Sequence, residues 1–192
     1  MTRAREIYFH EDDFCQQQLL PIEVAESAED EMKRMKEFAN SNRHPAGVGW
    51  TGIYVRKEMP VELHMLKLPH LQIATSIAPV LPLFDEVYTG YGSHREPCKN
   101  VAAWGLSDQC ALLIQSNEQG IVEHVWTEFF ARESDSIDAA TQAVAAIARH
   151  RPLIYVDWAW GYLCDASDEA TFSLRLHNKL DAIAKNSNPI RS

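Results

Sequence analysis

The segment CALLIQSNEQGIVEHVWTEFF, residues 110–130, decides the fold of this chain. Its two apolar, strand-like runs, 110–115 and 121–130, flank Asn117-Glu118-Gln119-Gly120, an order typical of a β-hairpin with a four-residue turn. A second apolar run, Leu153–Trp158, predicts a central strand that is buried on both faces. We therefore expect a sheet built around these strands.

Helices are predicted on both sides of this hairpin in the sequence. Apolar residues recur at helical spacing from near Glu23 onward, which favours a long helix there. Later helices are expected over Ile137–His150 and from about Asp168 to Lys185, the last with Ser167 as its N-cap. A short helix is expected after Pro69, and a first strand over Glu6–Phe9.

The fold class that follows is α+β. We expect a single globular domain over residues 1–192, mainly an antiparallel sheet with three or four helices packed on it. The ends, at about 1–4 and 187–192, are expected to be flexible.

The remaining segments give weaker patterns. Trp50–Arg56 and Val61–Leu68 are predicted as two strands around a turn at Lys57–Pro60. Tyr88–Gly105 is polar and broken by glycines and Pro97, and it is long for a passive connection. It is therefore predicted to be a functional loop.

Charge and cysteine content restrict the partners and the compartment. The chain has 27 acidic and 18 basic side chains, a net charge of -9, which repels phosphate backbones and anionic lipid. We expect neither nucleic acid nor a membrane as a partner, and no window approaches the ~20 apolar residues of a membrane span. The four scattered cysteines include no Cys-x-x-Cys pair, and a cytoplasmic location is expected.

Two sequence motifs fail when their context is considered. Gly47–Gly52 matches the dinucleotide-binding pattern Gly-x-Gly-x-x-Gly, but a polar loop precedes it and a strand-like segment follows, so no helix N-terminus faces a phosphate. His94–Cys98 contains parts of a zinc deaminase signature, yet Val101 stands where its second cysteine belongs.

Candidate binding residues cluster at the end of the Leu153–Trp158 strand and in the glycine-containing loop. Acids and aromatic rings alternate after the strand, which suits recognition of a basic protein or, alternatively, anchoring in a core or interface. The candidates at the strand end are Asp157, Trp158, Trp160, Tyr162 and Asp165. Those in the loop are Tyr91, His94 and Arg95.

A candidate metal site follows the first strand, where His10 and Asp12 lie in a run of four ionisable residues. The alternative is a solvated turn that ends an edge strand. If the fold brings Asp157 and His94 to the same place, these residues form a metal-binding or acid–base set.

Three functions remain open from the sequence. The first is a non-enzymatic acidic binding protein, such as a cytoplasmic inhibitor or neutraliser of a basic protein. The second is a small metal-dependent or acid–base enzyme, with a pocket formed by the N-terminal strand end, Asp157 and the 88–99 loop. The third is a structural homo-oligomer.

Overall fold

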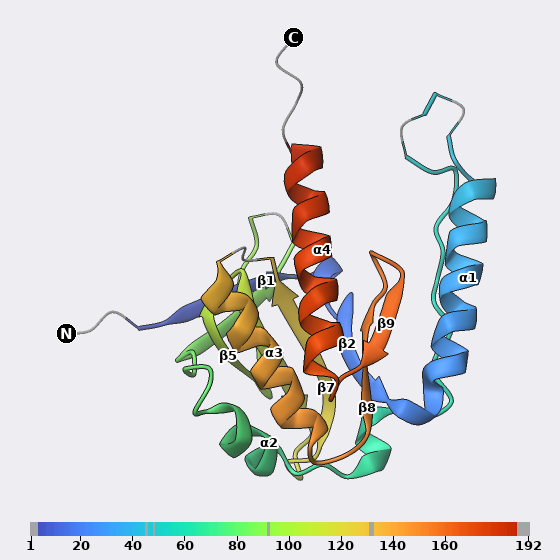
Figure 1. Cartoon of the computed structure of the whole chain (residues 1–192). Coiled ribbons are helices and arrows are strands. Elements are labelled where there is room, and N and C mark those ends of the chain that lie inside the picture. Colours follow the sequence, from blue (N-terminus) through green and yellow to red (C-terminus); the bar gives the residue numbers. More distant parts are fainter. Residues whose placement is uncertain (1–3, 45, 48, 92, 131–132, 188–192) are drawn as a thin grey trace.

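The computed structural model describes residues 4–44, 46–47, 49–91, 93–130 and 133–187. The ends at about 1–4 and 187–192 were predicted to be flexible. Of these residues, the structure describes 4 and 187, and the others lie outside its ranges. Within these ranges the chain forms a six-stranded antiparallel sheet, a three-stranded sheet and four α-helices, which confirms the predicted α+β class (Figure 1).

The large sheet has the strand order β5-β6-β7-β2-β8-β9. Its strands are β5 (Val101–Ser107), β6 (Cys110–Ser116), β7 (Val122–Phe129), β2 (Gln17–Pro21), β8 (Leu153–Asp157) and β9 (Tyr162–Asp165). β6 and β7 form the predicted hairpin, with Ile114 opposite Val125. Every residue of β8 is buried, and β8 pairs with β2 on one side and β9 on the other, as expected of a central strand.

The small sheet has the order β1-β3-β4 and lies against the β5–β7 half of the large sheet. β1 (Glu6–His10) runs parallel to β3 (Glu86–Gly90), which pairs antiparallel with β4 (Glu96–Pro97). Ile7, Phe9 and Val87 pack with Leu113 and Trp126 of the hairpin in one buried cluster.

The prediction of a loop over Tyr88–Gly105 is wrong, because this stretch includes part of β3, β4 and most of β5. Gly105 is one of the glycines on which the loop prediction rested. It instead allows close contact between strands, since a Cβ atom at this position would lie 2.4 Å from the carbonyl oxygen of Cys110. Glycine is therefore needed here for packing.

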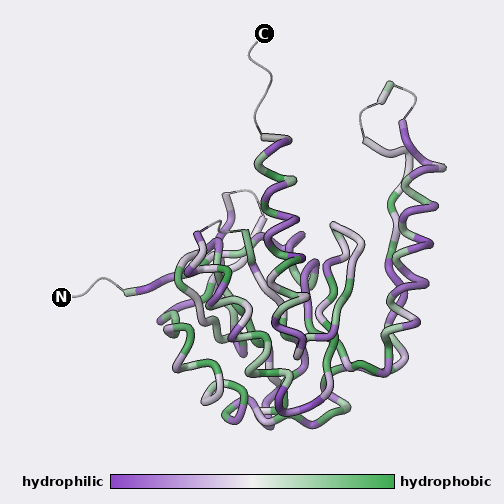
Figure 2. The backbone as a smooth tube through the Cα atoms, in the orientation of Figure 1, coloured by the Kyte–Doolittle hydropathy of each residue, from purple (hydrophilic) through white to green (hydrophobic). Residues whose placement is uncertain are grey.

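Helices cover both faces of the large sheet. Three helices lie on one face, and their apolar side chains form one hydrophobic cluster with that face of the sheet: α2 (His70–Ile77), α3 (Ser134–Ala148) and α4 (Glu169–Ser187) (Figure 1). α1 (Ala25–Ser41) packs on the opposite face, where Val24 and Ala28 contact the β8 residues Ile154 and Val156. Figure 2 shows that α1 is mostly hydrophilic, as expected of a helix that buries only a narrow stripe.

The helix predictions are correct in kind and differ at the ends. The N-cap of α4 is Asp168 and not the predicted Ser167. The Oδ1 atom of Asp168 accepts a hydrogen bond from the backbone N–H of Thr171 at 3.0 Å. Short 3₁₀ helices cover Glu11–Asp13, Ile22–Val24 and Leu63–Leu66. Among the described residues, every helix is too short or too polar to cross a lipid bilayer.

The two strands predicted over Trp50–Arg56 and Val61–Leu68 are not formed. The first stretch belongs to no named strand in the described part of the chain and has an isolated bridge only between Trp50 and Arg43. The second contains the 3₁₀ helix Leu63–Leu66. Burial nevertheless alternates along the first stretch, as it does in a strand. Tyr54 and Arg56 are partly buried, whereas Ile53 and Val55 are exposed.

Candidate functional site

A buried carboxylate on α1 holds the segment that follows this helix. The side chain of Glu31 is fully buried, and its Oε1 accepts hydrogen bonds from the Tyr54 hydroxyl and the Lys57 backbone N–H, each at 2.9 Å. Its Oε2 accepts from Arg34 Nε at 2.9 Å and Nη2 at 2.6 Å. Burial alone would raise the pKa of Glu31, but these donors lower it, so the carboxylate stays ionised.

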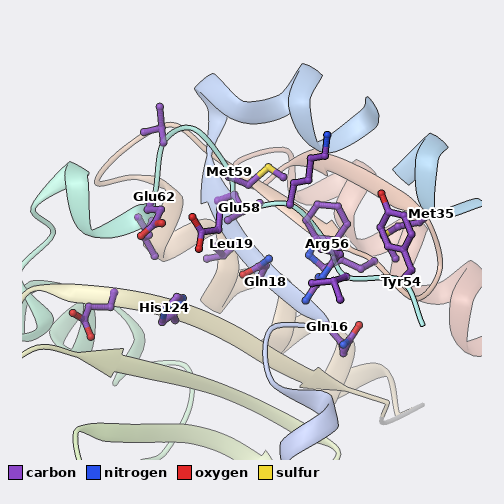
Figure 3. Close-up of a pocket in the computed structure, with 17 residues that line it drawn as sticks. Gln16, Gln18, Leu19, Met35, Tyr54, Arg56, Glu58, Met59, Glu62 and His124 are labelled. Atoms are coloured by element: carbon purple, nitrogen blue, oxygen red, sulfur yellow. The ribbon is translucent and has the colours of Figure 1, made fainter. Parts of the chain in front are cut away.

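The segment fixed by Glu31 forms one wall of a cleft of about 570 Å³, which we call the acidic cleft. Glu58 and Glu62 lie on this wall, and Glu123 of β7 also lines the cleft. Figure 3 shows Glu58 and Glu62 facing the sheet, with Arg56 and Tyr54 toward the other end. Three acids thus line the cleft against two bases, Arg56 and Lys57, and Glu58 and Glu62 lie away from Arg56.

A β-bulge brings Glu123 to the cleft. Ser116 pairs with Val122 and Gln115 pairs with His124, so Glu123 is an extra residue on β7. In a regular strand, Glu123 and His124 would point to opposite faces, but both line the cleft. The bulge thus adds a carboxylate beside the imidazole of His124.

Two polar side chains without a hydrogen-bond partner among the described residues lie across the cleft from Glu58 and Glu62. Gln18 of β2 and His124 line the cleft, and neither side chain makes a hydrogen bond to another described residue. Burial lowers the pKa of His124, although Glu123 and Glu62 oppose this shift, so the imidazole is neutral near pH 7. The cleft therefore offers hydrogen-bond acceptors to a cationic ligand.

Arg56 is already occupied by the protein itself. Its Nη1 donates to the backbone carbonyl of Cys15 at 3.2 Å, and its guanidinium lies 4.9 Å from the centre of the Trp158 ring. These contacts hold Arg56 at the end of the cleft away from Glu62 (Figure 3). Its charge therefore compensates that of Glu62 only from a distance.

An apolar surface adjoins the acidic cleft. Ile53 is 91% exposed, Val55 80% and Trp50 63%, and we call these three residues the exposed ridge. Single exposed apolar residues are ordinary, but here three fall within six positions; Ile53 and Val55 share the solvent side of the segment, and Trp50 lines a second groove. Val55 also lines the acidic cleft, so apolar and acidic surfaces are continuous.

The candidate binding residues at the end of β8 divide into buried and accessible groups. Asp157 is fully buried, with Oδ2 at 2.8 Å from Lys179 Nζ and Oδ1 accepting from the Trp160 N–H at 3.0 Å. Trp158 is also buried. The prediction that Asp157 and Trp158 belong to an exposed binding face is therefore wrong, because the sheet, α1 and α4 enclose them; the alternative of anchoring in the core is what the structure has.

The other residues of this segment are more accessible. Trp160 is 42% exposed, Tyr162 is partly buried, and Asp165 is exposed and caps the Ser167 N–H at 2.7 Å. Trp160 and Tyr162 line a second groove, between α1 and β9, and Asp165 does not. These residues therefore do not adjoin the acidic cleft.

The candidates of the glycine-containing loop lie beside the end of β1. The ring of Tyr91 is 4.9 Å from that of His10, Arg95 pairs with Glu6 at 2.9 Å, and His94 lies 3.6 Å from Glu96. The contact between Tyr91 and His10 follows from the parallel pairing of β1 with β3, which brings the His10 end of β1 beside Gly90, whereas Arg95 reaches Glu6 at the start of β1.

The predicted metal ligands do not assemble into one site. The Nδ1 atom of His10 lies 3.5 Å from Asp12 Oδ2 and already accepts the Asp12 backbone N–H. Both oxygens of Asp157 are occupied by Lys179 and Trp160. Within the described ranges, no three His, Cys, Asp or Glu side chains are placed to hold a metal ion.

Sequence reasoning missed the residues that build the acidic cleft. One signal was available, because Glu31 follows Ala28 and precedes Met35 on the buried stripe of α1, and an acid at such a position requires partners. Glu123 gave no such signal, since a bulge is not visible in the alternation of β7. Comparison with known proteins finds no matching family model, curated protein or solved structure.

Proposed function

We propose that this chain is a non-enzymatic binding protein that receives a basic loop of a partner protein in the acidic cleft. The observation that carries the proposal is the convergence of three carboxylates on one cleft, Glu58 and Glu62 from one wall and Glu123 from the sheet, where Gln18 and His124 also lie. A lysine or arginine side chain entering there would form charge-assisted hydrogen bonds with these oxygen and nitrogen acceptors.

The state of the three carboxylates supports this proposal. Neither Glu58 nor Glu123 forms an ion pair with another described residue, and Glu62 pairs only with the exposed His64, at 3.0 Å. The net charge of -9 would accelerate the approach of a cationic surface. The exposed ridge would add apolar contact area, as in interfaces that surround a few anchor residues with complementary surface.

An inhibitor or neutraliser of a basic protein fits this arrangement, because occupying a cationic surface blocks its access to anionic targets. A cytoplasmic location is part of the proposal. It is supported by the four cysteines, which are all free thiols, as is usual in a reducing compartment.

The test is affinity capture from an extract of the source cells, at physiological ionic strength, with three forms of the protein as bait. The wild type is compared with a cleft variant that carries Glu58→Gln, Glu62→Gln and Glu123→Gln. The matched control carries Glu26→Gln, Glu37→Gln and Glu118→Gln, which remove the same charge from exposed positions outside the cleft.

We expect a basic protein that the wild type and the control retain and that the cleft variant releases. If total charge alone were responsible, the two variants would lose the partner equally. Equal retention by the cleft variant and the wild type, or the absence of any basic protein from the wild-type eluate, would contradict the proposed function.

A further inference from the structure

A second groove, distinct in charge from the acidic cleft, lies between α1 and the β8–β9 hairpin. Its volume is about 790 Å³, within the range of about 300–1,000 Å³ that is usual for ligand sites. Met32 and Met35 of α1 line one side, and Trp160, Tyr162 and Leu163 line the other. Methionine and aromatic side chains adapt to varied apolar side chains.

The charges on this groove are mostly basic. Lys33, Lys36 and Arg175 line it, and Glu29 is the acid among its lining residues. Lys33 is paired with Asp30 at 3.0 Å and also lies near Glu29. Lys36 and Arg175 form no ion pair with any described acid, so two cations at the groove remain without a counter-charge.

One side of the groove is the edge of the large sheet. β9 is the last strand in the sheet order, and within the described part of the chain it pairs only with β8. The Ala166 N–H donates to the Leu153 carbonyl, and antiparallel hydrogen bonds alternate, so the N–H and C=O of Leu163 point away from β8. Such an edge can pair with an added strand.

Two buried polar atoms near β9 have no hydrogen-bond partner among the described residues, and they lie on opposite faces of the sheet. Trp158 is 4% exposed and its Nε1, which can only donate a hydrogen bond, has no partner; the hydroxyl of Tyr162 is likewise buried and unpaired. Both residues line the groove. Lys36 and Arg175 beside the open edge of β9 favour a ligand that carries oxygen acceptors.

We propose that this groove binds an extended, acidic peptide segment of another protein, which pairs with β9 as an added strand and directs carboxylates toward Lys36 and Arg175. Alternate side chains of the segment would occupy the apolar groove between α1 and β9. The site is independent of the acidic cleft, although Met35 and Trp158 line both.

The probe for this site is a capped peptide of about eight residues in which valine and glutamate alternate, because this pattern suits an added strand. We expect binding to change the tryptophan fluorescence and to slow amide hydrogen exchange at Leu163. The same peptide with lysine in place of glutamate, and a glutamate peptide that is N-methylated at alternate residues, should bind at least about tenfold more weakly.

The matched variants separate a local charge effect from a general one. Lys36→Gln with Arg175→Gln should weaken binding of the glutamate peptide about tenfold, whereas Lys67→Gln with Lys185→Gln removes the same charge outside the groove and should leave it nearly unchanged. The Glu58, Glu62 and Glu123 cleft variant should bind this peptide no more weakly than wild type, so failure of one site is distinguishable from failure of the other.

Four results would each overturn the inference. They are no binding of the glutamate peptide at millimolar concentration, equal binding of the lysine peptide, equal binding of the N-methylated peptide, and an undiminished affinity in the Lys36 and Arg175 variant. Circular dichroism of each variant establishes that the comparison is made between folded proteins.

Discussion

Replacing Glu31 with alanine should release the 50–60 segment from α1 and destabilise the protein. Oε1 of Glu31 joins the Tyr54 hydroxyl and the Lys57 N–H to the helix, and Oε2 accepts two hydrogen bonds from Arg34. Hydrogen bonds to a charged group contribute about 1.5–3 kcal/mol each. Arg34 is 44% exposed and can turn to water, so its share is reduced.

Counting the Tyr54 and Lys57 bonds in full and that of Arg34 only in small part, we expect Glu31→Ala to lower the free energy of unfolding by about 4 kcal/mol. Glu31→Gln keeps an acceptor for Tyr54 and Lys57 but loses the charge, and we expect a loss of about 2 kcal/mol. For a chain of this size, about 1 kcal/mol corresponds to a change in Tm of about 2–4 °C.

The assay is urea-induced unfolding, followed by circular dichroism at several pH values. Because the pKa of Glu31 is lower in the folded protein than its ordinary value of 4.5, its contribution is present above that value and disappears as the pH falls through the folded pKa. The difference between wild type and Glu31→Ala should therefore shrink in acid. If Glu31→Ala unfolds within about 0.5 kcal/mol of wild type at neutral pH, the anchoring role is refuted.

Further predictions concern the buried charges and one glycine. Lys179→Met should cost about 3–5 kcal/mol, because it leaves Asp157 buried without its cation, and adding Asp157→Leu should recover much of this loss in urea unfolding. Burial, with a contribution from Asp13, raises the pKa of Glu128 to about 8, so the folded protein holds a proton that the unfolded chain releases above about 4.5. Stability should fall by up to about 1.4 kcal/mol per pH unit between these values, and Glu128→Gln should remove that slope; an unchanged slope would contradict this. Gly105→Ala should cost about 1–3 kcal/mol, because the new Cβ meets the Cys110 carbonyl, and a Tm equal to that of wild type would show that β5 can shift.

The sequence was sufficient to predict elements whose hydrophobic pattern is local. The hairpin of β6 and β7, the buried strand β8 and the helices follow from alternation or helical spacing. β2 was not predicted, because Gln17 and Gln18 interrupt the apolar pattern at its start. In the structure the amide oxygen of Gln17 accepts a hydrogen bond from the buried Tyr155 hydroxyl at 2.8 Å, and a polar residue is thereby accommodated inside the sheet.

The candidate site was less predictable, because its residues are brought together by long-range contacts. Glu58 and Glu62 are ordinary surface acids in the sequence, and they form a wall only because Glu31 holds Lys57 against α1. Asp157 was conspicuous after an apolar run, but its partner Lys179 is 22 residues away on α4. Burial converts Asp157 from a candidate binding residue into half of an internal ion pair.

The most direct test of the central claim is a titration of the isotope-labelled protein with a short capped peptide that carries one arginine between leucines, followed by backbone amide chemical shifts. We expect the largest changes on Gln18, His124 and residues 55–59, and we expect a peptide with glutamate in place of arginine to leave these amides unchanged. Largest changes in the β1-β3-β4 sheet, or equal changes at the cleft with the glutamate peptide, would contradict it.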